Sequence, residues 1–241
     1  MLCGETRTQV HGGIGNGARF FQRIRFIIAR SWDFACRFQS AGAPERHDPG
    51  IEERSRRSRT QAQLDDTVRV VMVTGTGRAF SVGDDITGRS PAEPTRPLVT
   101  PVGSDHRIPT GTPDRFRAIS QALNIAIQNL DRITVAAING EAVQTGHSLA
   151  LGCDSRVPSE KARLRSGTLR FGLLPDEGGQ YLLVQHPGAG RTLDSLLRNR
   201  VVEAAEALAL GLVHKVVSYE PLLEESLETL PVTWLSVHRL P

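Results

Sequence analysis

The sequence predicts an α/β fold, because short apolar segments that end in glycine alternate with segments that have helical periodicity. Val68–Gly75 (VRVVMVTG) and Ile133–Gly140 (ITVAAING) are β-branched runs closed by glycine, which is typical of strands buried in a parallel or mixed sheet. Apolar residues recur at helical spacing over 114–130 and over Val202–Gly211. Strands that alternate with helices in this way indicate an α/β domain.

The composition is that of an ordinary globular protein. The 241 residues are 39% hydrophobic and 23% charged, which is enough for one large domain with its own core. Three cysteines (Cys3, Cys36 and Cys153) are too few and too scattered for a disulfide framework, and none has metal-ligand spacing. We therefore expect a reducing, cytoplasmic location and no metal.

Two partner classes are not predicted. The net charge is +3, and arginines cluster in the first 60 residues, but they do not belong to a recognisable nucleic-acid-binding module with interleaved aromatic residues. No apolar run approaches the roughly 18 residues that a membrane-spanning helix needs. We expect neither nucleic acid nor a membrane as a partner.

The elements divide the chain into three parts. Residues 1–63 are an atypical, Arg-rich region that we expect to be partly disordered, although the apolar spacing within Arg19–Phe38 predicts a helix there. Residues 64–230 form the predicted core, and 231–241 a short tail.

Within the core, further elements can be placed. Asp114 is a candidate N-cap of the helix over 114–130, and His147–Cys153 reads as a short buried helix. Gly211 closes the helix of Val202–Gly211, and Leu212–Val217 is predicted to be a strand.

One segment suggests a serine nucleophile. Gly146–Ala150 (GHSLA) matches the G-x-S-x-G elbow of α/β-hydrolases except at its last residue, with Ser148 as the nucleophile and Asp176 and His214 as loose partners. An elbow needs a strand that runs directly into the turn, whereas residues 140–145 intervene after the predicted strand. A serine hydrolase is therefore the least favoured alternative.

Four segments taken in order resemble the crotonase family, the enoyl-CoA hydratases and isomerases, over about residues 64–230. They are Val68–Ile86, Ile133–Val157, Arg170–Gly179 and Val202–Val217. The resemblance implies a crotonase-like spiral of ββα units that assembles as a trimer or hexamer. It also implies an acyl-CoA thioester as substrate, with coenzyme A as part of that substrate and no separate cofactor.

The resemblance also implies site residues. Family members hold a thioester enolate with two backbone N–H groups, which by motif match belong to Asp84 and Thr145. The same match makes Ser81, Gly83, Gly146 and His147 candidates for substrate binding. Here Gln144 and Thr145 replace glycines that the family usually has, so a Cβ crowds the thioester. For His147, a structural role at a helix start remains the alternative.

The two glutamates that hydratases use match Ser148 and Thr168, neither of which can act as a carboxylate base. Asp176 instead matches the single acidic base of the isomerase branches, so double-bond isomerisation is the favoured activity. An alternative is that Asp176 caps a helix that starts near Glu177. The altered glycines, the missing glutamates and the atypical ends leave open a non-catalytic protein that binds acyl-CoA or another subunit.

Overall fold

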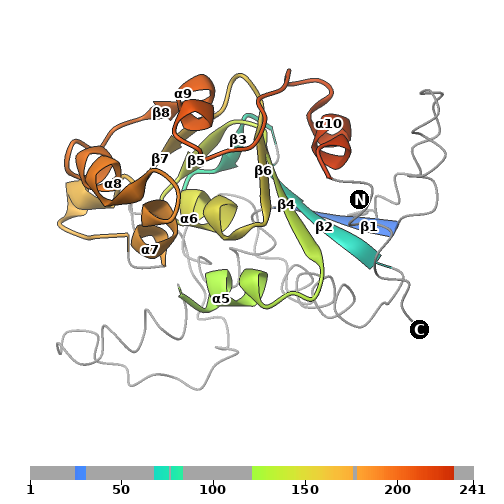
Figure 1. The fold of residues 1–241 in the computed structure, drawn as a ribbon, viewed down its shortest axis with the longest axis horizontal. Helices are drawn as coiled ribbons and strands as arrows, with labels where there is room; N and C mark the ends of the chain where they lie inside the picture. Colours follow the sequence, from blue (N-terminus) through green and yellow to red (C-terminus); the bar gives the residue numbers. More distant parts are fainter. Residues whose placement is uncertain (1–24, 31–67, 76, 84–120, 176–177, 231–241) are drawn as a thin grey trace, which may run out of the picture.

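The computed structural model describes residues 25–30, 68–75, 77–83, 121–175 and 178–230, which form two four-stranded sheets with helices packed against them (Figure 1). The first sheet has the order β1-β2-β4-β6, and all of its neighbouring strands are parallel. Its strands are β1 (Arg25–Arg30), β2 (Val68–Thr74), β4 (Ile133–Ile138) and β6 (Ser155–Pro158).

Three strands of the first sheet are each followed along the chain by a strand of a second sheet. Its order is β3-β5-β7-β8, in which β3, β5 and β7 are parallel and β8 is antiparallel to β7. The chain passes from β2 to β3, from β4 to β5 and from β6 to β7, so each turn of the chain adds one strand to both sheets. Its strands are β3 (Ala79–Ser81), β5 (Glu141–Val143), β7 (Arg163–Arg165) and β8 (Val202–Glu203).

Side-chain hydrogen bonds connect the successive bends at which the chain passes from the first sheet to the second. Asn139, at the bend after β4, accepts a hydrogen bond from the Gly75 N–H (2.9 Å). Its amide nitrogen donates to the carbonyls of Gly77 (2.8 Å) and Ala79 (3.2 Å). The Ser159 hydroxyl, at the bend after β6, donates to the Asn139 carbonyl (3.2 Å). These bonds satisfy backbone groups where the strands leave their sheet, and they set the spacing of the successive turns.

Helices cover both faces of the first sheet (Figure 1). Helix α6 is completely buried and is contacted by α5 and α7, whereas α10 lies against β4 and β6. Alternate residues of β2 and β4 therefore enter two separate apolar clusters, which explains their unbroken apolar sequence. The helices are α5 (Ala122–Gln128), α6 (Thr145–Gly152), α7 (Gly179–Val184), α8 (Gly188–Leu197), α9 (Ala204–Ala209) and α10 (Leu222–Glu228).

The α/β prediction is confirmed, and most core elements lie close to their expected positions. Helix α6 begins at Thr145, two residues earlier than predicted, and the predicted helix of Val202–Gly211 is divided between β8 and α9. Asp114 and the rest of residues 114–120 lie outside the described residues. No helix in the described part of the chain is long and apolar enough to cross a membrane.

Two predicted elements are wrong. Arg25–Arg30, placed in a helix by its apolar spacing, is strand β1 and pairs in parallel with β2 along its length. Leu212–Val217 is not a strand, since its only bridge joins Val217 to Ser159. Backbone bonds from His214 to Arg156 and from Val217 to Pro158 tie this segment to β6 at separate points. In both cases tertiary pairing overrides a local pattern.

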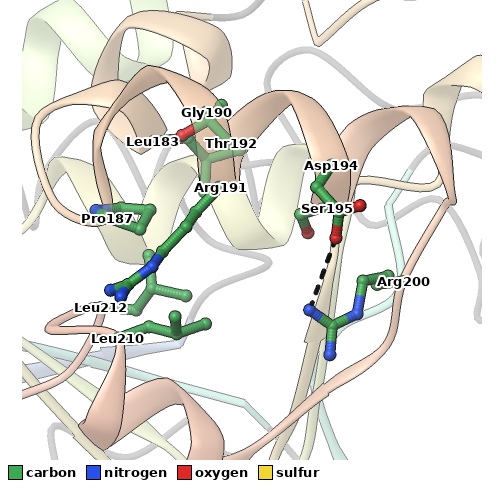
Figure 2. Close-up of a pocket in the computed structure, with 10 residues that line it drawn as sticks. All are labelled: Leu183, Pro187, Gly190, Arg191, Thr192, Asp194, Ser195, Arg200, Leu210 and Leu212. Carbon is green, nitrogen blue, oxygen red and sulfur yellow. Dashed lines mark ion pairs between the residues drawn. The ribbon is translucent and has the colours of Figure 1, made fainter.

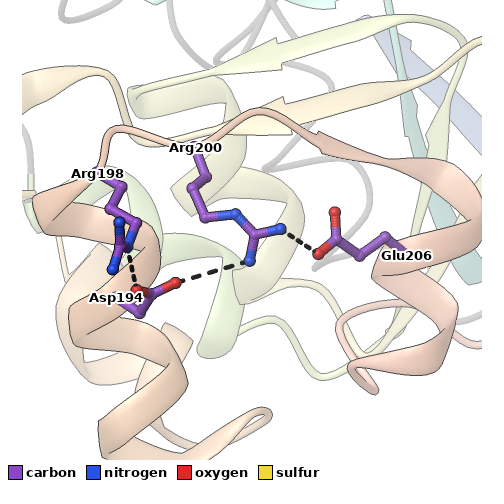
Figure 3. A network of polar contacts seen from close by, with 4 residues as sticks. All are labelled: Asp194, Arg198, Arg200 and Glu206. Atoms are coloured by element: carbon purple, nitrogen blue, oxygen red, sulfur yellow. Dashed lines mark hydrogen bonds and ion pairs between the residues drawn. The ribbon is translucent and has the colours of Figure 1, made fainter.

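An exposed group of charges links α8 to the start of α9 (Figure 3). Arg200 pairs with Glu206 (2.6 Å) and more distantly with Asp194 (3.8 Å), and Arg198 also pairs with Asp194. Because all four side chains are substantially exposed, solvent screens these pairs and they add little to stability.

Candidate active site

The predicted site residues follow the carboxyl ends of three parallel strands in the second sheet. β3 ends at Ser81, β5 ends at Val143 and β7 ends at Arg165. Parallel strands place these ends along one edge of the sheet, which is where ligands bind in open α/β sheets. Gly83, the start of α6 and Thr168 each come within three residues of such an end.

A sharp elbow joins β5 to α6. Gln144 lies between them with φ 53° and ψ −118°, and its N–H donates to the carbonyl of Arg165 on β7 (3.0 Å). The expectation that residues 140–145 separate a strand from the turn is therefore wrong, because β5 runs directly into the helix. The residue at the elbow is Gln144, however, and Ser148 lies one helical turn later.

The histidine proposed as a partner of Ser148 is engaged elsewhere. The backbone N–H of Arg156 donates to His214 Nδ1 (3.0 Å), so this nitrogen carries no proton. In a Ser-His-Asp triad the same nitrogen donates its proton to the acid. Together with the position of Ser148 in the helix, this geometry does not support a serine hydrolase.

The carboxyl end of α6 is capped by a buried cation. Arg156 donates to the carbonyls of Cys153 (2.7 Å) and Leu151 (3.4 Å) at the end of this helix. Its Nε donates to the carbonyl of Leu212 (2.6 Å). A cation at a helix carboxyl end interacts favourably with the helix dipole. The charge also satisfies carbonyls that would otherwise be buried without partners.

Close backbone approaches hold the end of β3 against the start of α6. A Cβ built on Gly146 would lie 2.5 Å from the Cβ of Ser81. A Cβ built on Gly83 would lie 2.9 Å from both Cβ and Oε1 of Gln144. The structure thus brings together three predicted substrate-binding residues, Ser81, Gly83 and Gly146. Thr145, the first residue of α6, is buried next to them in the chain.

Replacing Gly146 by alanine is expected to destabilise the protein by about 1–3 kcal/mol, because the new methyl group would overlap Ser81. The matched control is Gly190→Ala in α8, where a Cβ meets no atom within 4 Å. That change is expected to stabilise the helix by about 0.5–1 kcal/mol. Urea unfolding of both variants measures the two effects. Equal changes in the free energy of unfolding for the two variants would contradict the tight contact at Gly146.

The positions of the missing glutamates hold buried hydroxyl groups. Thr168, in the short 3-10 helix η2 (Thr168–Phe171), shares a hydrogen bond of 3.0 Å with the Ser166 hydroxyl. Ser148 lies against the first residue of α7, since a Cβ on Gly179 would lie 2.4 Å from its Oγ. Neither position offers a carboxylate, so the described part of the site has no pair of acidic groups for water addition.

Asp84, Asp176 and Glu177 lie outside the described residues. The base role of Asp176 and the donor roles of Asp84 and Thr145 therefore stay predictions. The alternative that Asp176 caps a helix starting near Glu177 is wrong, because α7 begins at Gly179 with Gly178 as its N-cap. Gly178 has φ 95°, a conformation that favours glycine.

His147 is buried in α6, and its Nε2 has no hydrogen-bond partner among the described residues. Burial, and to a smaller extent the charge of Arg156, lowers the pKa of His147 to about 4. The imidazole is therefore neutral at pH 7. No described contact joins His147 to Ser81 or Gly83, so its predicted role in substrate binding stays untested.

The lowered pKa of His147 predicts a loss of stability in acid. The unfolded chain takes up the proton near pH 6.5 and the folded chain only near pH 4, so stability falls as the pH drops between these values. The loss is about 3 kcal/mol at most. Urea unfolding at several pH values should show a shallower decline for His147→Leu. If the decline in His147→Leu equals that of wild type, the assignment to His147 is contradicted. His186→Gln is the control: His186 is less buried, so its replacement should alter the decline less than His147→Leu does.

A separate cavity of about 250 Å³ lies between α7, α8 and the segment after α9 (Figure 2). Leu183, Leu210 and Leu212 provide apolar walls, and the Arg191 side chain extends across it. None of the predicted site residues that the structure describes lines this cavity. No group of three or more His, Cys, Asp or Glu side chains that could hold a metal occurs among the described residues.

Sequence reasoning missed three residues that shape the site. Asn139 could have been noticed, because an Asn-Gly pair directly after a strand is a strong turn signal. Ser166, the partner of Thr168, and Arg156, the cap of α6, gave no signal. Their roles depend on carbonyls and hydroxyls that only the folded chain places beside them.

Comparison with known proteins identifies the family. Residues 106–235 match the enoyl-CoA hydratase/isomerase family, and this chain belongs to it. The chain is 29% identical, over 68% of its length, to 1,2-epoxyphenylacetyl-CoA isomerase of Escherichia coli. It spans 58% of that relative and 52% and 55% of relatives from Mycobacterium leprae and Mycobacterium tuberculosis, so it covers little more than half of their length.

Solved structures agree with this assignment and confirm the crotonase fold. An enoyl-CoA hydratase from Bacillus anthracis is similar with a TM-score of 0.63 and 26% identity, over 79% of this chain and 67% of that one. A monofunctional enoyl-CoA isomerase from M. smegmatis is similar with a TM-score of 0.57 and 25% identity, over 88% of this chain and 85% of that one. The resemblance predicted from four sequence segments is thus confirmed.

Proposed function

We propose that this protein isomerises a double bond in an enoyl-CoA thioester through an enolate intermediate. The observation that carries the proposal is the absence of a carboxylate at both positions where a hydratase has one, Ser148 and Thr168. Moving a double bond needs one acid–base group, whereas water addition in this family uses two.

In this mechanism the thioester oxygen accepts hydrogen bonds from the N–H groups of Asp84 and Thr145. The negative charge that develops on that oxygen is further stabilised by the amino end of α6. Asp176 removes a proton from one carbon of the acyl chain and returns it to another. The electrons of the broken C–H bond pass into the enolate and then into the new C–H bond, so atoms and charge balance. Coenzyme A enters as part of the substrate, and no further cofactor is needed.

A non-catalytic protein that binds acyl-CoA is the second candidate. It is favoured by the side chains of Gln144 and Thr145, which occupy positions where the family usually has glycine. Under either proposal we expect a homo-oligomer, a trimer or hexamer, in the cytoplasm.

The test offers a 3-enoyl-CoA and a 2-enoyl-CoA separately to the purified chain. The products are separated by chromatography to distinguish isomer from hydrated thioester. We expect isomerisation without accumulation of a 3-hydroxyacyl-CoA. Hydration as the main reaction would contradict the isomerase proposal. Binding of the thioesters without turnover, measured by calorimetry, would instead establish the second candidate.

A further inference from the structure

Gln144 has an unusual backbone conformation for a residue with a side chain. Its φ of 53° lies in the region that favours glycine, and its ψ of −118° lies far from the left-handed helical region. Among the described residues, the only other non-glycine residue with positive φ is Asn199, a type that tolerates such values. Strained residues persist only where their surroundings hold them, and they cluster at functional sites.

The surroundings of Gln144 hold it from three sides. Its N–H donates to the Arg165 carbonyl at the end of β7 (3.0 Å). Its carbonyl accepts a hydrogen bond from the Ser148 N–H in α6 (3.0 Å). Its side chain lies directly against Gly83, close enough that a Cβ there would approach Cβ and Oε1 of Gln144 to 2.9 Å. One residue thus connects the ends of β3 and β7 to the start of α6.

We propose that Gln144 is a positioning residue whose side chain supports the segment Ser81–Gly83. A glycine would adopt the same φ without strain, but it would leave the space beside Gly83 empty. The side chain therefore sets how far the backbone at Gly83 lies from the amino end of α6. The catalytic consequence rests on the proposed function, since these two segments carry the predicted donors Asp84 and Thr145.

Three proteins test this role: wild type, Gln144→Gly and Gln144→Met. Methionine keeps the length of the side chain, and it also keeps the cost of a positive φ. Hydrogen exchange is measured on peptides that cover Ser81–Gly83, with peptides from β2 as the internal control. We expect exchange to rise about tenfold in Gln144→Gly and to stay near the wild-type rate in Gln144→Met. The β2 peptides should be unchanged in both variants.

Stability separates positioning from a purely structural role. We expect Gln144→Gly to unfold at the same or a higher urea concentration than wild type, because strain is released. Faster exchange at Ser81–Gly83 without a loss of global stability would support the proposal. Equal exchange in all three proteins would overturn it, and so would Gln144→Met behaving like Gln144→Gly.

The exchange experiment needs no substrate, so it can fail or succeed independently of the proposed function. If wild type isomerises an enoyl-CoA, Gln144→Gly should lower kcat by about 10–100-fold, because small displacements of catalytic groups are costly. KM should change little. If wild type turns over nothing, the proposed function fails while the exchange result still decides the role of Gln144.

Discussion

Replacing Asp176 by asparagine should lower kcat for isomerisation of a 3-enoyl-CoA by about 10²–10⁴-fold, the usual contribution of a general base. Asparagine keeps the shape of the side chain but cannot accept the proton from the acyl chain. The described site offers no carboxylate at Ser148 or Thr168 to replace it. KM should change little, because in the proposed mechanism the thioester is held by backbone groups rather than by this carboxylate.

The neighbouring acid provides a matched control for Asp176. Glu177→Gln removes one negative charge at the adjacent position, and it should leave kcat unchanged if only Asp176 acts as the base. Steady-state rates for both variants, with calorimetric binding of the substrate, separate loss of chemistry from loss of binding. An Asp176→Asn variant that retains wild-type kcat, or an equal loss in both variants, would contradict the assignment.

Replacing Arg156 by methionine should lower the free energy of unfolding by about 3–5 kcal/mol. Methionine fills much of the volume but donates no hydrogen bond. The carbonyls of Leu151, Cys153 and Leu212 would then lose a charged donor in a buried region. Two of these carbonyls lie at the end of α6, so the change also removes the cation that complements the helix dipole.

Arg198→Met is the control for Arg156→Met, because Arg198 pairs with Asp194 on the surface and its side chain is 72% exposed. Urea unfolding should show no measurable change for this variant. A loss of less than about 1 kcal/mol for Arg156→Met, the size of one ordinary hydrogen bond, would contradict a structural role for the buried cation.

The strands that were predicted correctly are those whose sequence reflects burial on both faces. β2 and β4 lie between two apolar clusters, so nearly every residue is apolar and no other element fits so short a run. The family resemblance could be recognised from the sequence because tight bends of the fold require glycine. Bends such as Gly75 and Gly140 leave no room for a Cβ, so the glycines appear in the sequence itself.

The site was only partly predictable. Comparison with the family pattern showed that Ser148 and Thr168 stand where hydratases have glutamates, and that Gln144 replaces a glycine. It could not show that Gln144 is the elbow residue, because the position of an elbow depends on where β5 ends. A three-residue strand such as β5 carries too little periodicity to be recognised.

Three features can be read from the amino-acid sequence alone: the α/β class, the buried central strands and the lack of acidic residues at the two glutamate positions. These features depend on the type of residue at each position, which can be read without coordinates. The strand at Arg25–Arg30, the cap that Arg156 provides for α6 and the contact between Gln144 and Gly83 become visible only in the folded chain. Each of these depends on partners distant in the sequence, whose hydrogen bonds and packing outweigh local preference.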